Sequence, residues 1–367
     1  MPENFIAKIE HALNKGLEEG VYPGAVLLVG RKGKVLFLQA VGHASIRPAM
    51  VKMREDTIFD LASLTKPLAT ALAVMKLVDK GVLHLESPLK DLLPAKVPMD
   101  KASITLRQLL SHSAGLPDWK PFYREVQDMD RKTRKQKVWQ LILETKLVHS
   151  PGQKALYSDL GYMLLEWLVE ASSGKSLPDF VGPYFYEPLG LKRTFFQETD
   201  APIKFDLDQY AATEDCPWRG KVVQGVVHDE NAYTMGGYSG HAGLFSTAPE
   251  VHVLCHTLLE HYQGKRNDLL SPFTAKSFLS PQCKPMGTTW ALGWDTPSLN
   301  GSSAGQHFSS SSVGHLGFTG TSIWMDLKKE LIVVLLTNRI HLSRKNEKIR
   351  IFRPYLHDLI AEWVGCD

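Results

Sequence analysis

Ser63 and Lys66 are the two residues whose types and spacing best suit covalent catalysis. They begin and end the run Ser63-Leu64-Thr65-Lys66, and on a helix a three-residue spacing places two side chains on one face, one turn apart. A lysine that has lost its own proton can remove that of the serine hydroxyl, which activates a weak nucleophile. The same spacing recurs at Ser87–Lys90 and at Ser172–Lys175, so the flanking residues must decide among three pairs.

The flanking residues favour Ser63. Pro88 follows Ser87 directly, so that serine is expected to begin a turn. Gly174 stands at the place of a helix C-cap, so Ser172 is expected at a solvated helix end. Ser63 precedes a run of apolar residues at helical spacing, and the free N–H groups of a helix start can stabilise negative charge. The alternative for Ser63 is an N-cap serine beside a surface lysine.

Composition is that of an ordinary globular protein. The 367 residues suffice for one large domain or two modest ones, with 44% hydrophobic and 22% charged residues. Lys and Arg number 42 and Asp and Glu 39, so no global field would attract nucleic acid or an anionic membrane. The basic stretch 131–137 contains no aromatic residue and follows Asp128 and Asp130, so we interpret it as a solvated face.

No motif indicates a disulfide framework, a metal site or a cofactor. The cysteines are far apart and form no C-x-x-C pair, at Cys216, Cys255, Cys283 and Cys366. The run His228-Asp229-Glu230 contains three consecutive ionisable residues. We interpret this run as part of a loop or as substrate lining rather than as a set of metal ligands. The first residues show no leader pattern and the apolar run 331–336 is too short to span a bilayer. We therefore expect a cytoplasmic protein, or a periplasmic one if a leader has been removed.

β-rich runs lie near both ends of the chain. Residues 24–30 and 35–41 are joined by a short connection containing Gly33, which predicts an antiparallel hairpin. Residues 315–325 and 331–337 predict a second hairpin near the other end.

From Ser63 to about residue 180, between these hairpins, the periodicity is mostly helical. Helices at about residues 5–17 and 354–364 open and close the chain, and capping-box patterns begin at Thr105 and Thr247. This order predicts an α+β fold, an α/β sandwich in which one antiparallel sheet from both chain termini is flanked by helices, with a mostly helical region inserted.

Two further motifs follow Ser63 in order. Tyr157-Ser158-Asp159 precedes an apolar helix, and His315-Leu316-Gly317 begins the predicted late strand. With these motifs the chain resembles the serine β-lactamase and penicillin-binding-protein superfamily, and within it the class C β-lactamases, DD-peptidases and family VIII carboxylesterases. Segments 104–117, 240–247 and 335–339 extend the resemblance over nearly the whole chain.

The resemblance implies a β-lactamase/transpeptidase-like fold and a division of the chain. Residues 1–66 and 240–367 would form an α/β domain with the central antiparallel sheet. Residues 67–239 would form a mostly helical domain, with the active site between the two.

The resemblance also implies the roles of the site residues. Ser63 would be the nucleophile, and Lys66 and Tyr157 would together act as general base and then as general acid. This would require pKa values well below the reference of about 10 for both side chains. The backbone N–H groups of Ser63 and Phe318 would form the oxyanion hole. Gly317 would leave room for the substrate backbone.

Two positions depart from the family pattern. Asp159 stands where the family usually has Asn, so a substrate-binding amide donor is replaced by an acceptor. His315 stands where Lys is commoner, so a fixed positive charge facing a substrate carboxylate is lost. His315 could assist proton transfer, or it could orient its neighbours on the strand by a hydrogen bond.

These departures favour a serine hydrolase that forms an acyl-enzyme on Ser63, most simply a carboxylesterase acting on small acyl esters. The alternatives are a D-alanyl-D-alanine carboxypeptidase or β-lactamase-type hydrolase, and a non-turnover penicillin-binding module. The expected partner is a small-molecule ester or amide substrate, with no nucleic acid and no membrane span. The sequence leaves the oligomeric state open.

Overall fold

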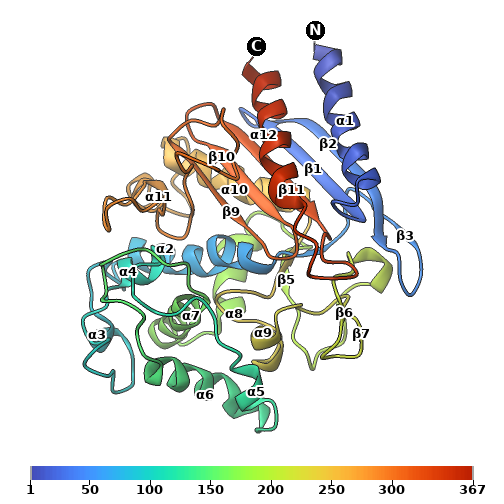
Figure 1. Cartoon of the computed structure of the whole chain (residues 1–367). Helices are drawn as coiled ribbons and strands as arrows, with labels where there is room; N and C mark the ends of the chain where they lie inside the picture. The colour runs from blue at the N-terminus through green and yellow to red at the C-terminus, as the bar shows by residue number, and fades with distance from the viewer. Residues whose placement is uncertain (1, 366–367) are drawn as a thin grey trace.

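The computed structural model describes residues 2–365, with side chains from residue 5 onward, and it is built on one six-stranded antiparallel sheet (Figure 1). The strand order is β3-β2-β1-β11-β10-β9, so strands from the two chain ends meet in the middle. This confirms the predicted fold class. The strands are β1 (Gly24–Arg31), β2 (Lys34–Ser45), β3 (Val51–Lys52), β9 (Ser312–Leu316), β10 (Ser322–Asp326) and β11 (Leu331–Thr337).

Both predicted hairpins are present, but the late one needs a correction. Lys32 and Gly33, both with positive φ, form the two-residue turn between β1 and β2, as favoured hairpin turns require. The run 315–325 is not one strand, because β9 ends at Leu316 and β10 begins only at Ser322. The turn between them closes with a hydrogen bond from Gly317 N to Thr321 O, and Gly320 adopts a φ of 110°.

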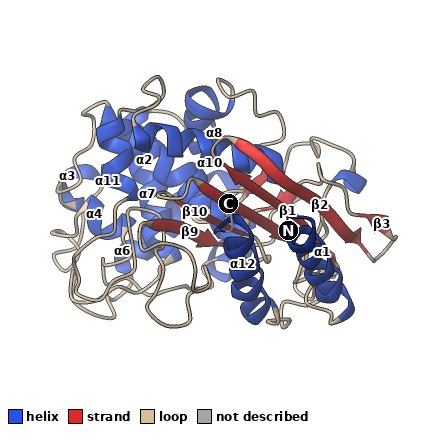
Figure 2. Cartoon of the chain, turned by 90° about the horizontal axis from the view of Figure 1, so that it is seen from above, coloured by secondary structure: helices blue, strands red, loops and turns tan. Residues whose placement is uncertain are grey.

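Helices cover both faces of the sheet, so the central strands are apolar throughout (Figure 2). Ala25, Leu27 and Val29 of β1 pack with α1 and α12 on one face. The alternate residues Val26 and Leu28 belong to the larger core on the other face. The covering helices are α1 (Pro2–Glu18) and α12 (Ile349–Gly365) on the first face and α10 (Ala248–Gln263) on the second, where α11 (Pro272–Leu279) packs against α10.

The helices of the inserted region lie together beneath the sheet in the view of Figure 1. These helices are α2 (Ala71–Asp79), α3 (Leu89–Leu92), α4 (Leu106–Leu110), α5 (Tyr123–Val126), α6 (Arg131–Glu144), α7 (Asp159–Ser173), α8 (Leu177–Val181), η3 (Gly182–Tyr186) and α9 (Glu230–Thr234). Short strands and turns complete the chain: β4 (Phe59–Asp60), η1 (Ala62–Leu64), η2 (Lys66–Thr70), β5 (Phe195–Phe196), η4 (Leu207–Gln209), β6 (Asp215–Cys216), β7 (Lys221–Val222) and β8 (Leu244–Ser246). The division of the chain into residues 1–66 with 240–367, and 67–239, stays a prediction.

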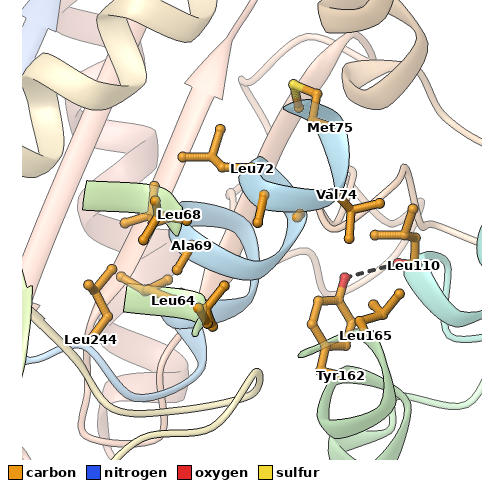
Figure 3. Close-up of a cluster of buried hydrophobic side chains, with 14 of the residues drawn as sticks. Leu64, Leu68, Ala69, Leu72, Val74, Met75, Leu110, Tyr162, Leu165 and Leu244 are labelled. Carbon is orange, nitrogen blue, oxygen red and sulfur yellow. Dashed lines mark hydrogen bonds between the residues drawn. The ribbon is translucent and has the colours of Figure 1, made fainter. Parts of the chain in front are cut away.

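The helical segment after Ser63 lies at the centre of the core (Figure 3). It runs from η1 through the π-helical turn η2 into α2, and its buried Leu64, Leu68 and Leu72 contact neighbouring elements. Each fully buried leucine contributes roughly 1.5–3 kcal/mol. Tyr162 of α7 donates a hydrogen bond at 3.1 Å to the carbonyl of Leu110, the last residue of α4. This packing holds the segment that carries Ser63 and Lys66 in a fixed orientation.

Of the two predicted capping boxes, one is complete and the other is only half formed. Thr105 and Gln108 form a complete capping box at α4. Thr247 caps α10 by accepting from Glu250 N, but the Glu250 carboxylate is turned away to bind the backbone N–H groups of Lys192 and Arg193. The second capping box is therefore only half formed.

Candidate active site

Ser63 lies in a strained turn that directly follows β4. Ala62 adopts a φ of 49°, which residues other than glycine rarely adopt. One oxygen of the buried Asp60 carboxylate accepts a hydrogen bond from Ala62 N at 2.9 Å and so helps to hold this conformation. The Ser63 side chain lies at the start of the helical segment and is partly exposed.

Asp60 also connects this turn to a segment far away in the sequence. Its second carboxylate oxygen accepts a hydrogen bond from His228 N at 2.7 Å. Burial raises the pKa of Asp60, while the hydrogen bonds from His228 and Ala62 act in the opposite direction. The turn that carries Ser63 and the segment 227–232 are therefore fastened together at one buried carboxyl group.

Lys66 is completely buried and its ammonium group has three hydrogen-bond acceptors. Its Nζ lies 3.0 Å from Ser63 Oγ, 2.7 Å from Asp159 Oδ1 and 3.2 Å from the carbonyl oxygen of His241. Of the three Ser–Lys pairs found in the sequence, only this one is joined by a hydrogen bond within residues 2–365. Ser87 instead precedes α3, and Ser172 lies in the last turn of α7, before the C-cap Gly174.

The protonation of the site differs from the prediction made for Tyr157. Burial lowers the pKa of Lys66, and the negative charge of Asp159 partly offsets this. Burial and the same negative charge raise the pKa of Tyr157 well above its usual value. The low pKa that the implied role would require of Tyr157 is therefore absent from the resting site, because burial and, after it, the charge of Asp159 favour the phenol. Tyr157 is a neutral phenol in the resting site.

Tyr157 lies within a group of aromatic rings just before α7. Its ring centroid is 4.7 Å from that of His112, 5.8 Å from that of Trp290 and 6.0 Å from that of His315. Ser158 caps α7 by accepting from Gly161 N, which places Asp159 in the first turn of the helix. Lys66 Nζ lies 4.8 Å from the centre of the Tyr157 ring. Tyr157 and Asp159, from the start of α7, and His315, from β9, thus gather around Lys66.

His315 is buried on β9 and carries no charge. Its Nδ1 donates to the carbonyl oxygen of Leu316 at 2.9 Å, so the other nitrogen, Nε2, holds a lone pair. Burial, followed by the charge of Lys66, lowers the pKa of His315 to about 3. The family's fixed positive charge at this position is therefore not replaced by a histidine cation.

The turn between β9 and β10 is fastened to the residues just before Ser63. Thr319 Oγ1 donates to the carbonyl of Asp60 at 2.8 Å, and Thr321 Oγ1 donates to that of Leu61 at 3.0 Å. These bonds bring Phe318 next to the Ser63 turn. Within residues 2–365, neither the backbone N–H of Ser63 nor that of Phe318 has a hydrogen-bond acceptor, so both remain available to a ligand.

Gly317 is required for a different reason from the one predicted. A Cβ built on Gly317 would lie 1.9 Å from Thr321 Oγ1 and 2.5 Å from the carbonyl oxygen of Leu61. The absence of a side chain is therefore needed for the turn to close against the nucleophile segment. These contacts constrain the turn itself and do not bear on room for a substrate backbone.

A second ion pair, which the sequence reasoning missed, lies beside Lys66. His241 Nε2 is 2.9 Å from Asp229 Oδ1, and Asp229 also caps α9 by accepting from Ala232 N. Burial lowers the pKa of His241, but Asp229 raises it above its usual value overall, while the pKa of Asp229 is held low. The sequence analysis singled out both segments, 227–232 for its ionisable residues and 240–247 for its resemblance to the family. Nothing in the sequence indicated that Asp229 and His241 would pair.

Other predictions concern cysteines and metals. Cys216 and Cys255 are buried free thiols and Cys283 is an exposed one, whereas Cys366 lies outside the described residues. His228 contacts Glu214 at 3.0 Å, and Glu214 and Glu230 both bind Arg344, so this segment forms an ion-pair network. Among residues 2–365, no three His, Cys, Asp or Glu side chains gather closely enough to hold a metal ion.

Comparisons with known proteins show the class to which this fold and site belong. The family model described as Beta-lactamase matches residues 9–353. The chain is 34% identical to the Bacillus subtilis (strain 168) protein named "N-acetylmuramyl-L-alanine amidase", over 92% of this chain and 81% of that one. It is also 34% identical to the Escherichia coli (strain K12) protein named "Putative D-alanyl-D-alanine carboxypeptidase", over 87% and 79% of the two chains.

Solved structures show the same fold at lower identity. The hydrolase EstCE1, described as having promiscuous acyltransferase activity, superposes with a TM-score of 0.75 at 23% identity, covering 96% of this chain and 99% of that one. The octameric penicillin-binding-protein homologue from Pyrococcus abyssi gives 0.74 at 22% identity, covering 97% and 77%.

The chain belongs to the beta-lactamase family and is a serine hydrolase. In the part of the chain that the structure describes, every helix is too short or too polar to cross a membrane.

Proposed function

We propose that this protein hydrolyses acyl substrates through an acyl-enzyme on Ser63. The observation that carries the proposal is the hydrogen bond between Lys66 Nζ and Ser63 Oγ, 3.0 Å long, at the start of a helical segment. Ser63 Oγ attacks the acyl carbonyl carbon, and the backbone N–H groups of Ser63 and Phe318 stabilise the resulting oxyanion. Each such donor is typically worth about 3–4 kcal/mol in the transition state.

Lys66 and Tyr157 take different parts in the proton transfers. Lys66 is the base, since burial lowers its pKa and its nitrogen already contacts the hydroxyl. Tyr157 holds its proton at rest and so can deliver it to the departing group, then recover it through Lys66. In deacylation the same two groups activate water and return the proton to Ser63 Oγ.

Small acyl esters are the substrates that the charges around Ser63 favour. His315 is neutral, so it presents no cation to a substrate carboxylate. Asp159 is an acceptor already bound to Lys66, so it offers no amide donor to an acyl-amide carbonyl. An alcohol leaving group also needs less help from a proton donor than an amine does.

Amide bonds in peptidoglycan fragments are the second candidate substrate. The observation in its favour is the pair of relatives at 34% identity, one named as a muramyl-alanine amidase and one as a D-alanyl-D-alanine carboxypeptidase. The same Ser63 chemistry serves both substrate classes, so the two candidates differ in the groups that bind the substrate and not in the mechanism.

One panel of assays separates these candidates. Purified protein is incubated with p-nitrophenyl acetate and butyrate, N-acetylmuramyl-L-alanine, a D-Ala-D-Ala peptide and nitrocefin, and intact mass is followed after a short pulse. Ester turnover that exceeds amide turnover supports the first candidate, and the reverse order supports the second. Stable acylation by nitrocefin with no turnover of any substrate would indicate a penicillin-binding module.

The Ser63→Ala variant tests the nucleophile in the same panel. It should lose both turnover and the acyl mass adduct, while Ser172→Ala, which alters the alternative pair, should retain both. Activity that survives Ser63→Ala would refute the proposal.

A further inference from the structure

Arg353 of α12 is a buried cation without a partner. Only 3% of its surface is exposed, and within residues 2–365 its guanidinium makes no ion pair and no hydrogen bond, with Nε fully shielded. The other buried cations all have acceptors: Lys66 binds Asp159, Lys101 binds Asp100, and Arg339 binds the carbonyl of Phe318. Arg353 therefore differs from every other buried lysine or arginine that the structure describes.

The surroundings of Arg353 lie between α12 and the sheet, on the face away from Ser63. His357 is one helical turn further along α12, and its ring lies 5.7 Å from that of Phe308. Phe308 in turn lies 6.3 Å from Trp324 of β10. Since alternate residues of a strand share a face, Ser322 points to the same side as Trp324.

This region is rich in unused hydrogen-bond donors. Trp324 Nε1 and Ser322 Oγ are both buried and both lack a partner among the described residues. His357 donates through Nδ1 to the carbonyl of Ser303, and burial lowers its pKa to about 3, so it is neutral. The polar groups of β10 and α12 here thus offer an indole N–H, a hydroxyl and a guanidinium.

The neighbouring acids are already engaged and do not neutralise Arg353. Asp326, on the same face of β10, accepts hydrogen bonds from Ser309 and from the backbone of Lys328 and Lys329. Asp358 accepts from Gln306 N.

The other charged groups near Arg353 add mostly positive charge. The positive charge of Arg339 is, after burial, the second cause that lowers the pKa of Arg353 to about 9. Around Arg339, the positive charge of Arg350 is offset by Glu347, with which Arg350 forms an ion pair of 2.8 Å. The charge that acts on Arg353 itself is therefore a positive one, that of Arg339.

A buried guanidinium cannot lower its cost by losing its proton, because arginine stays charged at neutral pH. An unpaired buried charge is among the most expensive features of a folded protein, and buried charges are accordingly paired or bound to ions. The physical requirement is a compact negative charge that also accepts from nearby N–H and O–H groups.

We propose that a small anion binds Arg353 between α12 and β10, with Ser322 and Trp324 as further donors. The chemistry that fits is a compact anion of the size of chloride, phosphate or acetate. Such an anion would balance Arg353 and reduce the repulsion on Arg339, which donates to the carbonyl of Phe318. The proposal is independent of the catalytic role of Ser63 and stands or falls without it.

Thermal unfolding under varied anions tests the site. Wild-type protein is titrated with sodium chloride, phosphate or acetate, and sodium gluconate keeps the ionic strength constant. Binding to the folded state alone should raise Tm in a saturable way by about 2–6 °C for at least one of the three anions. The most effective anion identifies the preferred chemistry.

Two variants separate the site from general salt effects. Arg353→Met should abolish the anion-dependent rise in Tm. Arg350→Met removes the same charge one turn earlier on α12, where the arginine is 73% exposed, and should keep the rise. An anion response that is absent in wild type, or equal in wild type and Arg353→Met, would overturn the proposal.

A crystallographic measurement covers the case in which Arg353→Met does not fold. Wild-type crystals soaked in sodium bromide should show an anomalous peak within hydrogen-bonding distance of the Arg353 guanidinium. Ordered bromide elsewhere but not at Arg353, or water hydrogen-bonded to all its nitrogens, would refute the proposed site.

Discussion

Lys66 and Asp159 form an ion pair of 2.7 Å in the site, with the lysine completely buried. Asp159 therefore does more than replace an asparagine amide by an acceptor. Its charge favours the protonated form of Lys66, which is the wrong form for a base, and it also raises the pKa of Tyr157. Burial lowers the pKa of Lys66 and the ion pair raises it. The balance of the two sets the pH at which neutral Lys66 is present.

Replacing Asp159 by Asn should shift the pH profile to lower pH. Loss of the negative charge lowers the pKa of Lys66, so the neutral base is present at lower pH. The acid limb of kcat/KM for p-nitrophenyl acetate should move down by about one pH unit or more. Asp118→Asn, which alters an exposed carboxylate on the adjacent loop, should leave the limb in place. An unchanged or upward-shifted limb in Asp159→Asn would contradict this assignment.

Tyr157→Phe should slow acyl transfer without unfolding the protein. The phenol is the proposed proton donor, and general acid–base groups contribute about 10²–10⁴-fold to rates. The ring contacts with His112 and Trp290 remain, so Tm should change little. Tyr162→Phe is the matched control, because it removes a buried hydroxyl bound to Leu110 O. That variant should lose about 1 kcal/mol of stability but keep its kcat. The opposite pattern would show that Tyr157 is structural.

Thr321→Val should lower kcat by about tenfold or more, with a small change in KM. The valine keeps the shape but leaves the Leu61 carbonyl without its donor, so the turn that carries Phe318 loosens relative to Ser63. Thr321→Ser restores the hydroxyl and should restore kcat. Equal losses in both variants would mean that the methyl group, rather than the hydrogen bond, is what matters.

Glu214→Gln should remove part of the pH dependence of stability in acid. Burial raises the pKa of Glu214, but hydrogen bonds from His228 and Arg344 lower it to about 2, below its ordinary 4.5. A depressed carboxyl pKa contributes stability above pH 4.5 that is lost as the pH falls toward 2. Urea unfolding between pH 7 and 3 should show a loss on the order of 2 kcal/mol in Glu214→Gln at pH 7 and a flatter dependence below pH 5. Glu55→Gln, which alters an exposed carboxylate, should behave like wild type. If the free energy of unfolding of Glu214→Gln depends on pH in parallel with wild type, the depressed pKa of Glu214 does not contribute to acid stability.

The sequence predicted those features that depend on local spacing. Ser63 and Lys66 share a helix face because they are three residues apart, and the β1–β2 hairpin follows from its Gly-containing connection. The late strand was wrong because apolar and β-branched residues continue through the turn. Only Gly317 and Gly320 marked the break, and Gly317 was assigned to substrate approach.

Features that depend on residues distant in the sequence could not be predicted. The charge state of Tyr157 depends on where Asp159 points, and the His241–Asp229 pair joins two loops. The bonds from Thr319 and Thr321 to the Ser63 turn join residues near opposite ends of the chain. None of these contacts leaves a spacing or a periodicity in the sequence.

The pairing of β1 with β11 has a consequence for synthesis of the protein. Ala25 pairs with Val41 of β2 on one edge of β1 and with Thr337 of β11 on the other, so a nascent chain carries β1 with one unpaired edge until β11 has left the ribosome. Phe318 joins Ser63 at the same late stage. A chain terminated before β9 would contain Ser63 and Lys66 but would lack Phe318 and half of the central sheet.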